Sequence, residues 1–301
     1  MPAITEPSSV TPISTVSWRE LLAEVESQLA DPNEARWICE HASGCDRDEF
    51  RLLLNDHVTV TMARNVHQMM ARRLEGEPLQ YVMQRWSFRH LDVLVDARVL
   101  IPRSETEQVV DVALDLARRL QQRESRPLNI VDLGTGSGVI GLSMASELGL
   151  GTTKIWLTDL SDDALHVARA NLSGIGRAAE HVRVVQGNWY GALPMSLRGA
   201  VDLIVCNPPY IADGDPEVAS DVYTYEPHVA LFGGSDGLDA ISEIIAAAPE
   251  WLVAGGWLVS EIGYRQGDAV SEFFTRAGFT EVEIINDLAG HPRIARGRNR
   301  N

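Results

Sequence analysis

A rigid tetrapeptide, Asn207-Pro208-Pro209-Tyr210, carries the residue types that could hold a planar nitrogen for chemistry. Proline fixes its own φ angle and has no N–H to donate, so this stretch presents stiff backbone carbonyls as acceptors. Asn207 adds a side-chain carbonyl, and Tyr210 adds an aromatic face. A planar NH2 group could donate one hydrogen to the Asn207 side chain and the other to the Pro208 carbonyl, with Tyr210 fixing its plane. The competing interpretation is a simple turn, because Asn and Pro are common turn residues.

A glycine loop, Gly134-Thr135-Gly136-Ser137-Gly138, is the second candidate site, directly after the buried run Ile130–Leu133. Glycine has no Cβ, so backbone N–H groups in such a loop can approach a ligand closely. The loop alone is ambiguous, because residues 136–141 also satisfy the dinucleotide pattern G-x-G-x-x-G, and an NAD enzyme remains a rival. Asp159 follows at the spacing expected of a carboxylate that accepts the ribose hydroxyls of an adenosine cofactor, or it caps the next helix.

Two further residues, Asn188 and Trp189, follow the next strand-like run, where the adenine ring of such a cofactor would lie. An indole can cover the face of a purine, and an asparagine amide can read its edge. We therefore expect both to line the cofactor site, although a tryptophan in isolation is more often a core or rim residue.

Alternating strand-like and helix-like segments must position both sites. Strands are predicted at Leu128–Leu133, Ile155–Asp159, Val182–Gln186, Val201–Cys206 and Trp257–Ile262, and helices near Val139–Leu148, Asp162–Ile175 and Leu238–Leu252. The alternation predicts an α/β fold with an open, mostly parallel sheet and helices on both faces. The carboxyl ends of parallel strands form the ligand crevice, so the tetrapeptide and the glycine loop should face one cleft. Ser104 should cap another helix, with Glu107 completing a capping box.

Four regions follow from these patterns. Residues 1–17 are rich in Pro, Ser and Thr and are expected to be a flexible tail. Residues 18–76 repeat apolar positions at helical spacing without a strand signal, which predicts a small helical bundle that recognises a partner. Residues 77–103 alternate apolar and polar positions and predict a β-hairpin linker, and residues 104–301 form the α/β domain.

The overall composition narrows the function classes. A formal net charge of -16 disfavours nucleic acid as a partner, because binding phosphates requires a basic surface. The chain has no apolar run of membrane-spanning length, and its first residues lack the pattern of a signal peptide, so a cytoplasmic protein is expected. Its three cysteines lack the spacing of a metal or disulfide site. The basic run at 293–300 is interpreted as a solvated tail.

Several separated motifs resemble the HemK/PrmC family of methyltransferases, in the same order and over nearly all of the chain beyond the first fifteen or so residues. They are Glu77-Pro78-Leu79-Gln80-Tyr81, Phe88, Leu100-Ile101-Pro102-Arg103-Ser104-Glu105-Thr106-Glu107, Asp132 to Gly138, Asn207 to Ile211, Tyr225 to Leu231 and Gly234 to Leu238. The resemblance implies a Rossmann-like class I methyltransferase sheet with a small N-terminal helical bundle and a hairpin linker, and S-adenosylmethionine as the cofactor.

The resemblance also implies a reaction: methyl transfer to the N5 side-chain amide of the glutamine in the Gly-Gly-Gln motif of class I peptide chain release factors. These factors are then the expected partners of a metal-free monomer. The implied catalytic residues are Asn207, Pro208 and Tyr210, and substrate binding adds Pro209 and Phe88. The implied cofactor residues are Gly134, Thr135, Gly136, Ser137, Gly138, Asp159, Asn188, Trp189 and Asn207. Because the tetrapeptide also occurs in enzymes that methylate adenine N6 or guanine N2, a nucleic-acid methyltransferase is the alternative, and a non-catalytic cofactor-binding module is a third possibility.

Three positions depart from the family pattern. Gln84 stands where a glycine is usual, and Ser104 stands where a proline is usual, which should alter the hairpin region. Asn188 replaces an aspartate, so one amide oxygen stands where a carboxylate would offer two, and the reading of the adenine edge should change.

Overall fold

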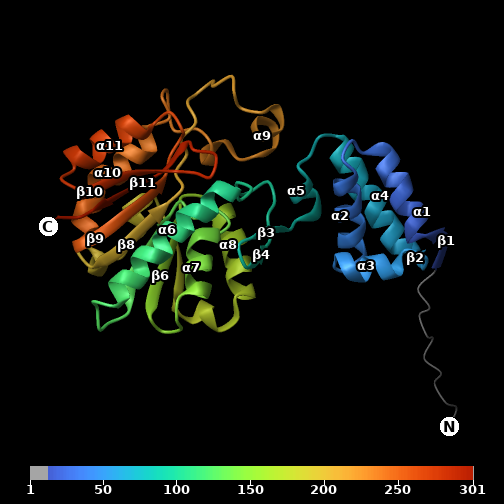
Figure 1. Ribbon diagram of the computed structural model, residues 1–301, viewed down its shortest axis with the longest axis horizontal. Coiled ribbons are helices and arrows are strands. Elements are labelled where there is room, and N and C mark those ends of the chain that lie inside the picture. Colours follow the sequence, from blue (N-terminus) through green and yellow to red (C-terminus); the bar gives the residue numbers. More distant parts are fainter. Residues whose placement is uncertain (1–12, 301) are drawn as a thin grey trace, which may run out of the picture. The chain divides into compact units, whose positions relative to one another are not determined.

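The computed structural model describes residues 13–300, which divide into two compact units, one ending at Met83 and the other beginning at Gln84 (Figure 1). In this part of the chain no helix combines the length and the apolar character needed to cross a membrane.

The described residues of the first unit form a bundle of five helices, as the apolar spacing predicts: α1 (Trp18–Gln28), α2 (Pro32–Ser43), α3 (Arg47–Leu53), α4 (Val60–Leu74) and α5 (Leu79–Met83). Capping boxes start α1 at Ser17 and α3 at Asp46, each satisfying backbone N–H groups that the first helical turn leaves unpaired. Trp18, Ile38 and Phe50 are at most 3% exposed and form part of a core separate from that of the second unit.

The expectation that this region contains no strand was wrong. β1 (Ile13–Ser17) pairs antiparallel with β2 (His57–Thr59), which leads directly into α4. A strand of three residues is too short to show an alternating pattern in the sequence. Part of the tail expected at 1–17 is therefore a paired strand, and the rest of that tail lies outside the described residues.

A seven-stranded sheet forms the middle of the second unit, in the order β10-β11-β9-β8-β5-β6-β7. Its strands are β5 (Leu128–Leu133), β6 (Thr153–Asp159), β7 (Val182–Gln186), β8 (Val201–Cys206), β9 (Leu252–Glu261), β10 (Thr280–Asn286) and β11 (Pro292–Arg298). The five strands predicted from apolar runs are all present and mutually parallel, whereas β11 runs antiparallel to both of its neighbours.

Helices cover both faces of this sheet, as predicted (Figure 1). They are α6 (Ser104–Gln121), α7 (Val139–Glu147), α8 (Asp162–Gly174), α9 (Ser220–Tyr225), α10 (Asp239–Trp251) and α11 (Gly267–Arg276). Apolar side chains of α10 and α11 share one core with alternate residues of the strands, such as Val131 and Leu133. Because side chains alternate across a strand, the intervening residues face the helices of the other layer.

The arginine run near the end of the chain is structured, and its interpretation as a solvated tail was wrong. Arg296 and Arg298 lie in β11, and their guanidinium groups pair with Glu283 and Glu281 of β10. The Arg293 side chain is only 14% exposed, and its guanidinium lies beside Asp287. These arginines therefore join neighbouring strands at one edge of the sheet.

The segment expected as a linker is divided between the units. Helix α5 belongs to the first unit, since Leu79 and Val82 lie in the core of the bundle. The hairpin of β3 (Trp86–Phe88) and β4 (Leu91–Val93) belongs to the second. Between them, Gln84 adopts a left-handed φ of 54°, a conformation that glycine tolerates best.

The capping box expected at Ser104 is absent. Ser104 is the first residue of α6, after Arg103, and its hydroxyl bonds to Glu105 instead of a backbone N–H. The Glu107 carboxylate accepts a hydrogen bond from the backbone N–H of Arg89 at 3.0 Å, and so connects α6 to the hairpin. The helix therefore starts one residue earlier than a cap at Ser104 would require.

Candidate functional site

The site lies where four parallel strands end on the same line. Leu133 of β5 pairs with Thr158 of β6 and Cys206 of β8, and Cys206 pairs with Ser260 of β9. The residue that follows this line on each of the four chain segments is Gly134, Asp159, Asn207 or Glu261; β5 and β8 end at the line, and β6 and β9 end one residue beyond it. The order of the strands thus brings the glycine loop and the tetrapeptide to one edge of the sheet, as the topological argument predicts.

A cavity of about 290 Å³ opens at this edge. It is lined by most of the residues expected to hold the cofactor, namely Gly134, Thr135, Gly136, Ser137, Asp159, Asn188, Trp189 and Asn207. Gly138 does not line it but occupies the N-cap of α7 with a φ of 91°, where an added Cβ would lie 2.9 Å from Leu142. The glycine at this position is therefore needed to start the helix.

Gly136 shows why the loop can receive a ligand. Its φ is 55°, and a Cβ built on it would meet no protein atom within 4 Å, so this backbone is open to the cavity. The Gly136 N–H donates to Asp159 Oδ2 at 2.9 Å, and the Ser161 N–H donates to Asp159 Oδ1 at 2.9 Å. Burial raises the pKa of Asp159. The cap of the next helix is Ser161, whose hydroxyl accepts from the Ala164 N–H at 3.2 Å, so the interpretation of Asp159 as the helix cap was wrong. Each oxygen of the Asp159 carboxylate retains acceptor capacity for a ribose hydroxyl.

The base of the loop is held by Asp132, the fifth residue of β5. Its Oδ2 accepts hydrogen bonds from the Thr135 hydroxyl at 2.5 Å and from the Gly141 N–H at 3.0 Å. Its Oδ1 is buried and has no hydrogen-bond partner among the described residues. Burial is the largest cause that raises the pKa of Asp132, from 3.8 to about 6.

The last glycine of the dinucleotide-like pattern, Gly141, has a packing role. A Cβ at this position would lie 2.1 Å from the Leu157 side chain of β6, so only glycine lets α7 pack this closely on the sheet. Dinucleotide-binding folds need a glycine here for the same reason. The loop geometry is therefore compatible with any adenosine cofactor and does not by itself separate the methyl donor from NAD.

Trp189 lies against the glycine loop. A Cβ on Gly134 would lie 3.2 Å from the indole ring, and Trp189 itself has a φ of 40°, which is unusual for a residue with a side chain. Such backbone strain persists only where the surroundings enforce it, often at ligand sites. The neighbouring Asn188 is exposed and lines the same cavity. Both residues thus lie where an adenine ring was expected.

A second cavity, of about 210 Å³, adjoins the first and shares Leu100, Asn207 and Ala230 with it. The tetrapeptide is distributed between the two. Asn207 lines both cavities, Pro209 lines the larger one and Tyr210 lines the smaller one. Pro208 is buried and lines neither of them. Asn207 is therefore placed to act on groups in both cavities.

Phe88, expected from the resemblance to contact the substrate, is 1% exposed in the β3–β4 hairpin and lines neither cavity. The structure thus places it in the packing of the hairpin, apart from the residues that it brings together at the end of the sheet. In the described part of the chain, no group of three or more His, Cys, Asp or Glu side chains is arranged to hold a metal ion.

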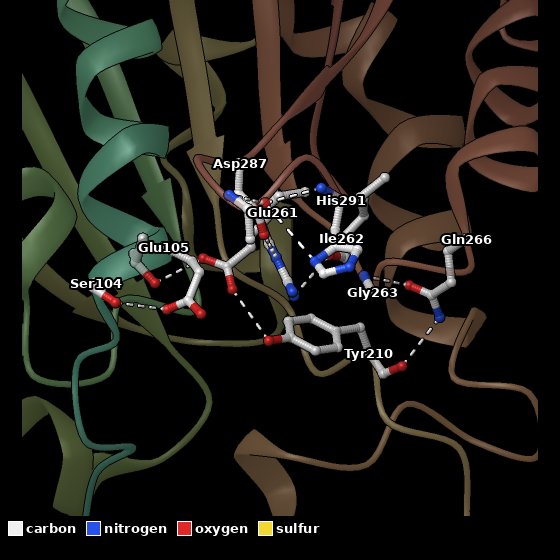
Figure 2. A network of polar contacts seen from close by, with 12 residues as sticks. Ser104, Glu105, Tyr210, Glu261, Ile262, Gly263, Gln266, Asp287 and His291 are labelled. Atoms are coloured by element: carbon white, nitrogen blue, oxygen red, sulfur yellow. Dashed lines mark hydrogen bonds and ion pairs between the residues drawn. The ribbon is translucent and has the colours of Figure 1, made fainter. Parts of the chain in front are cut away.

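Two residues to which the sequence analysis gave no role, Thr106 and Glu261, connect the tetrapeptide to the core. Asn207 Nδ2 donates to Thr106 Oγ1 at 3.3 Å, and the Thr106 hydroxyl donates to Glu261 Oε2 at 2.7 Å. The Tyr210 hydroxyl donates to Glu261 Oε1 at 3.2 Å (Figure 2). Glu261 is the residue after the paired line in β9, so the argument that found Asn207 at the end of β8 could also have found Glu261.

The backbone of Tyr210 is held as well. Figure 2 shows the Gln266 side chain between Tyr210 and Gly263, where its Nε2 donates to the Tyr210 carbonyl at 3.0 Å and its Oε1 accepts from the Gly263 N–H at 2.9 Å. Burial is the main cause that raises the pKa of the Tyr210 phenol, so the hydroxyl remains a donor at neutral pH. Both ends of this tyrosine are therefore fixed before any substrate arrives.

Comparison with known proteins agrees with this architecture. The family model for the PrmC N-terminal domain matches residues 17–83, and that for the methyltransferase small domain matches residues 106–224. The N-terminal domain of human METTL16, solved with S-adenosylhomocysteine, has a TM-score of 0.52 at 15% identity and covers 88% of this chain and 94% of that one. At this identity the likeness shows the fold alone.

The sequence relatives are much closer. The release factor glutamine methyltransferase of Bordetella pertussis is 40% identical, over 89% of this chain and 97% of the relative. That of Xylella fastidiosa is 39% identical, over 88% of this chain and 92% of the relative. The similarity spans both units at nearly full length for each relative. The chain therefore belongs to the HemK/PrmC family of release factor glutamine methyltransferases.

Proposed function

We propose that this protein transfers a methyl group from S-adenosylmethionine to the N5 side-chain amide of the glutamine in the Gly-Gly-Gln motif of class I peptide chain release factors. The observation that carries the proposal is the position of Asn207, which lines both the cavity beside the glycine loop and the smaller cavity beside Tyr210. One residue thus touches the place for the cofactor and the place for the target side chain.

The larger cavity fits the cofactor. Asp159 is available to the ribose hydroxyls, Trp189 and Asn188 to the adenine, and the open backbone at Gly136 to the amino acid end. When bound, S-adenosylmethionine supplies a methyl group on a positively charged sulfur that is ready to leave. The work left for the protein is to align the receiving nitrogen, which contributes about 7–11 kcal/mol when the geometry is close to that of attack.

The smaller cavity suits a primary amide. An amide nitrogen is a poor nucleophile because its lone pair is delocalised into the carbonyl group. The Asn207 side-chain oxygen and the Pro208 carbonyl each accept one of its hydrogens in our proposal, and the Tyr210 ring fixes its plane. These interactions strengthen as the nitrogen becomes more electron-rich, so they favour the transition state over the bound substrate. The proton leaves late in the transfer, to water.

The partner is a release factor, and the protein acts as a cytoplasmic monomer in this proposal. A net charge of -16 favours a protein substrate over a nucleic acid. The helical bundle recognises the release factor at a distance from the reacting amide.

The decisive experiment is a transfer assay with labelled S-adenosylmethionine and a purified class I release factor, followed by mass mapping of its peptides. We expect one methyl group on the glutamine of the Gly-Gly-Gln motif. A release factor with that glutamine changed to alanine is the matched control and should remain unlabelled. Transfer to purified RNA or DNA in place of the release factor would instead support a nucleic-acid methyltransferase, and tight binding of NAD without the methyl donor would refute the cofactor assignment.

A further inference from the structure

The chemistry of Asn207 depends on which end of its amide faces the cavities. The oxygen accepts hydrogen bonds and the nitrogen donates them, and the two ends have nearly the same shape. If the Asn207 side-chain amide could flip, its NH2 group would face the substrate NH2 group for part of the time, and two hydrogen-bond donors would then meet. A substrate with two hydrogens to give therefore needs Asn207 held with its oxygen toward the cavity.

The contacts of Thr106 hold the Asn207 amide with its oxygen toward the cavity. A threonine hydroxyl has one hydrogen, and that of Thr106 goes to the Glu261 carboxylate at 2.7 Å. Both oxygens of Glu261 accept a hydroxyl hydrogen, one from Thr106 and one from Tyr210, so Thr106 has only lone pairs left for Asn207. Asn207 must then turn its Nδ2 to Thr106, as the 3.3 Å contact shows, and its oxygen is left for another partner.

Glu261 is an unusual residue to find at this place. It is 1% exposed, and Thr106, which lines the wall of the larger cavity beside Asn207, is 3% exposed, so both polar side chains are buried. Burial raises the pKa of Glu261, and the Thr106 hydroxyl, the Arg293 charge and the Tyr210 hydroxyl oppose the rise. A buried carboxylate is costly, and an apolar residue would pack with less penalty. Its two oxygens bind the two hydroxyls that contact or belong to the tetrapeptide.

We propose that Thr106 and Glu261 are positioning residues that act through the tetrapeptide. Glu261 takes the hydrogen of Thr106, which makes Thr106 an acceptor that locks the Asn207 amide, and the same carboxylate anchors the Tyr210 ring. The network makes the site selective for nitrogens that carry two hydrogens. This inference rests on the proposed function only for the identity of the nitrogen.

The main test is Thr106→Val, which keeps the shape of the side chain and removes the hydroxyl. The rate constant for methyl transfer in a single turnover should fall by about 10- to 100-fold, whereas the affinity for S-adenosylmethionine should stay within about threefold. Thr106→Ser restores the hydroxyl and should recover most of the rate. Thr153→Val is the matched control, because Thr153 is also buried, at 6% exposed, but lies at the opposite end of the sheet.

A second variant keeps the test open if Thr106→Val does not fold. Glu261→Gln offers one acceptor and one donor where the carboxylate offers two acceptors, so it cannot receive both hydroxyl hydrogens. It should slow transfer on the same scale without loss of cofactor binding. Transfer at the wild-type rate in a folded Thr106→Val or Glu261→Gln protein would overturn the proposal, as would a Thr106→Ser protein as slow as Thr106→Val.

A measurement that needs no methyl transfer separates this inference from the proposed function. With asparagine labelled with nitrogen-15, the side-chain resonance of Asn207 is identified by its loss in Asn207→Asp. Thr106→Val and Glu261→Gln should shift this resonance, and Thr153→Val should leave it in place. If the shifts occur but no release factor is methylated, the proposed function fails and the positioning network stands. An unshifted resonance in both variants refutes the network.

Discussion

At the scale of single residues, Asn207 is the polar residue that lines both cavities. Asn207→Ala should lower kcat for methyl transfer by about 100-fold or more, because it removes an acceptor whose contribution grows toward the transition state. Cofactor affinity should change little, since many other residues line the larger cavity.

Tyr210→Phe retains the aromatic face but leaves one oxygen of Glu261 without its donor, so its effect should lie between those of the wild type and Tyr210→Ala. Single-turnover transfer, with melting curves as a check of folding, measures each effect, and near-normal turnover by Asn207→Ala would eliminate the clamp.

Asp132 provides a prediction about pH at the same scale. Its pKa is raised from 3.8 to about 6 in the folded protein, so the folded state binds the proton more tightly than the unfolded chain. Its contribution to stability is therefore fully present below about pH 4 and is lost as the pH rises through about 6. Asp132→Asn can still accept from Thr135 and Gly141, and it removes the titration.

Between pH 4 and pH 7, the free energy of unfolding should therefore fall less for Asp132→Asn than for the wild type. The difference between the two falls should be up to roughly 3 kcal/mol. Urea unfolding at several pH values measures the difference between the two proteins. Other titrating carboxyls are common to both and cancel in that difference. Parallel pH profiles would show that the Asp132 carboxyl stays ionised in the folded state throughout this range.

At the scale of elements, the sequence predicted the five parallel strands of the sheet, most clearly the buried β5 and β8. β5 and β8 have the predicted bounds because each is a short, mostly apolar run between turns. β10 and β11 were missed because charged residues interrupt them, and the charges satisfy one another across the strands, as in the pair of Arg296 and Glu283. The roles of Thr106 and Glu261 were missed because a single buried polar residue gives no periodic signal, and the contact between them depends on the order of the strands.

The departures from the family pattern acquire physical reasons at this scale. Gln84 has a φ of 54°, so the usual glycine would avoid the steric cost of a left-handed conformation, about 1–2 kcal/mol for a residue with a Cβ. Ser104 is the first residue of α6, where proline is favoured, and Arg103 before it is already extended, with a ψ of 151°.

Gln84→Gly and Ser104→Pro should therefore each stabilise the protein, by about 0.5–1 kcal/mol, since relief of strain or loss of unfolded-state freedom outweighs the opposing terms. Thermal and urea unfolding of the two variants measure the gain. Gly44→Gln is the matched reverse change, because Gly44 ends α2 with a φ of 72° and has no neighbour within 4 Å of an added Cβ; it should destabilise by a similar amount. A destabilised Gln84→Gly protein would show that the side chain at 84 makes contacts worth more than the strain.

At the scale of the whole molecule, the two units have separate cores, and all residues that line the two cavities belong to the second. A fragment that begins at Gln84 should therefore bind S-adenosylmethionine with nearly the affinity of the full chain. Its transfer to an intact release factor should fall by at least about tenfold, the effect of losing roughly 1.4 kcal/mol of docking energy. Calorimetric titration and steady-state transfer measure the two quantities. Unchanged kinetics would mean that the helical bundle does not recognise the substrate.

Asn207 lines both cavities, and the number of hydrogen bonds that the proposed clamp accepts has a consequence for the product. The amide before transfer brings two hydrogens to two acceptors, whereas the methylated amide brings one. Re-entry of the product in the same pose leaves one acceptor unpaired, at a cost of about 1–3 kcal/mol. A methylated peptide should therefore bind at least about fivefold more weakly than the unmodified peptide, and mass spectrometry should find no dimethylated glutamine. Equal affinities would contradict this. In the proposed clamp, the number of acceptors thus limits each amide to one methyl group, and the same imbalance favours release of the product.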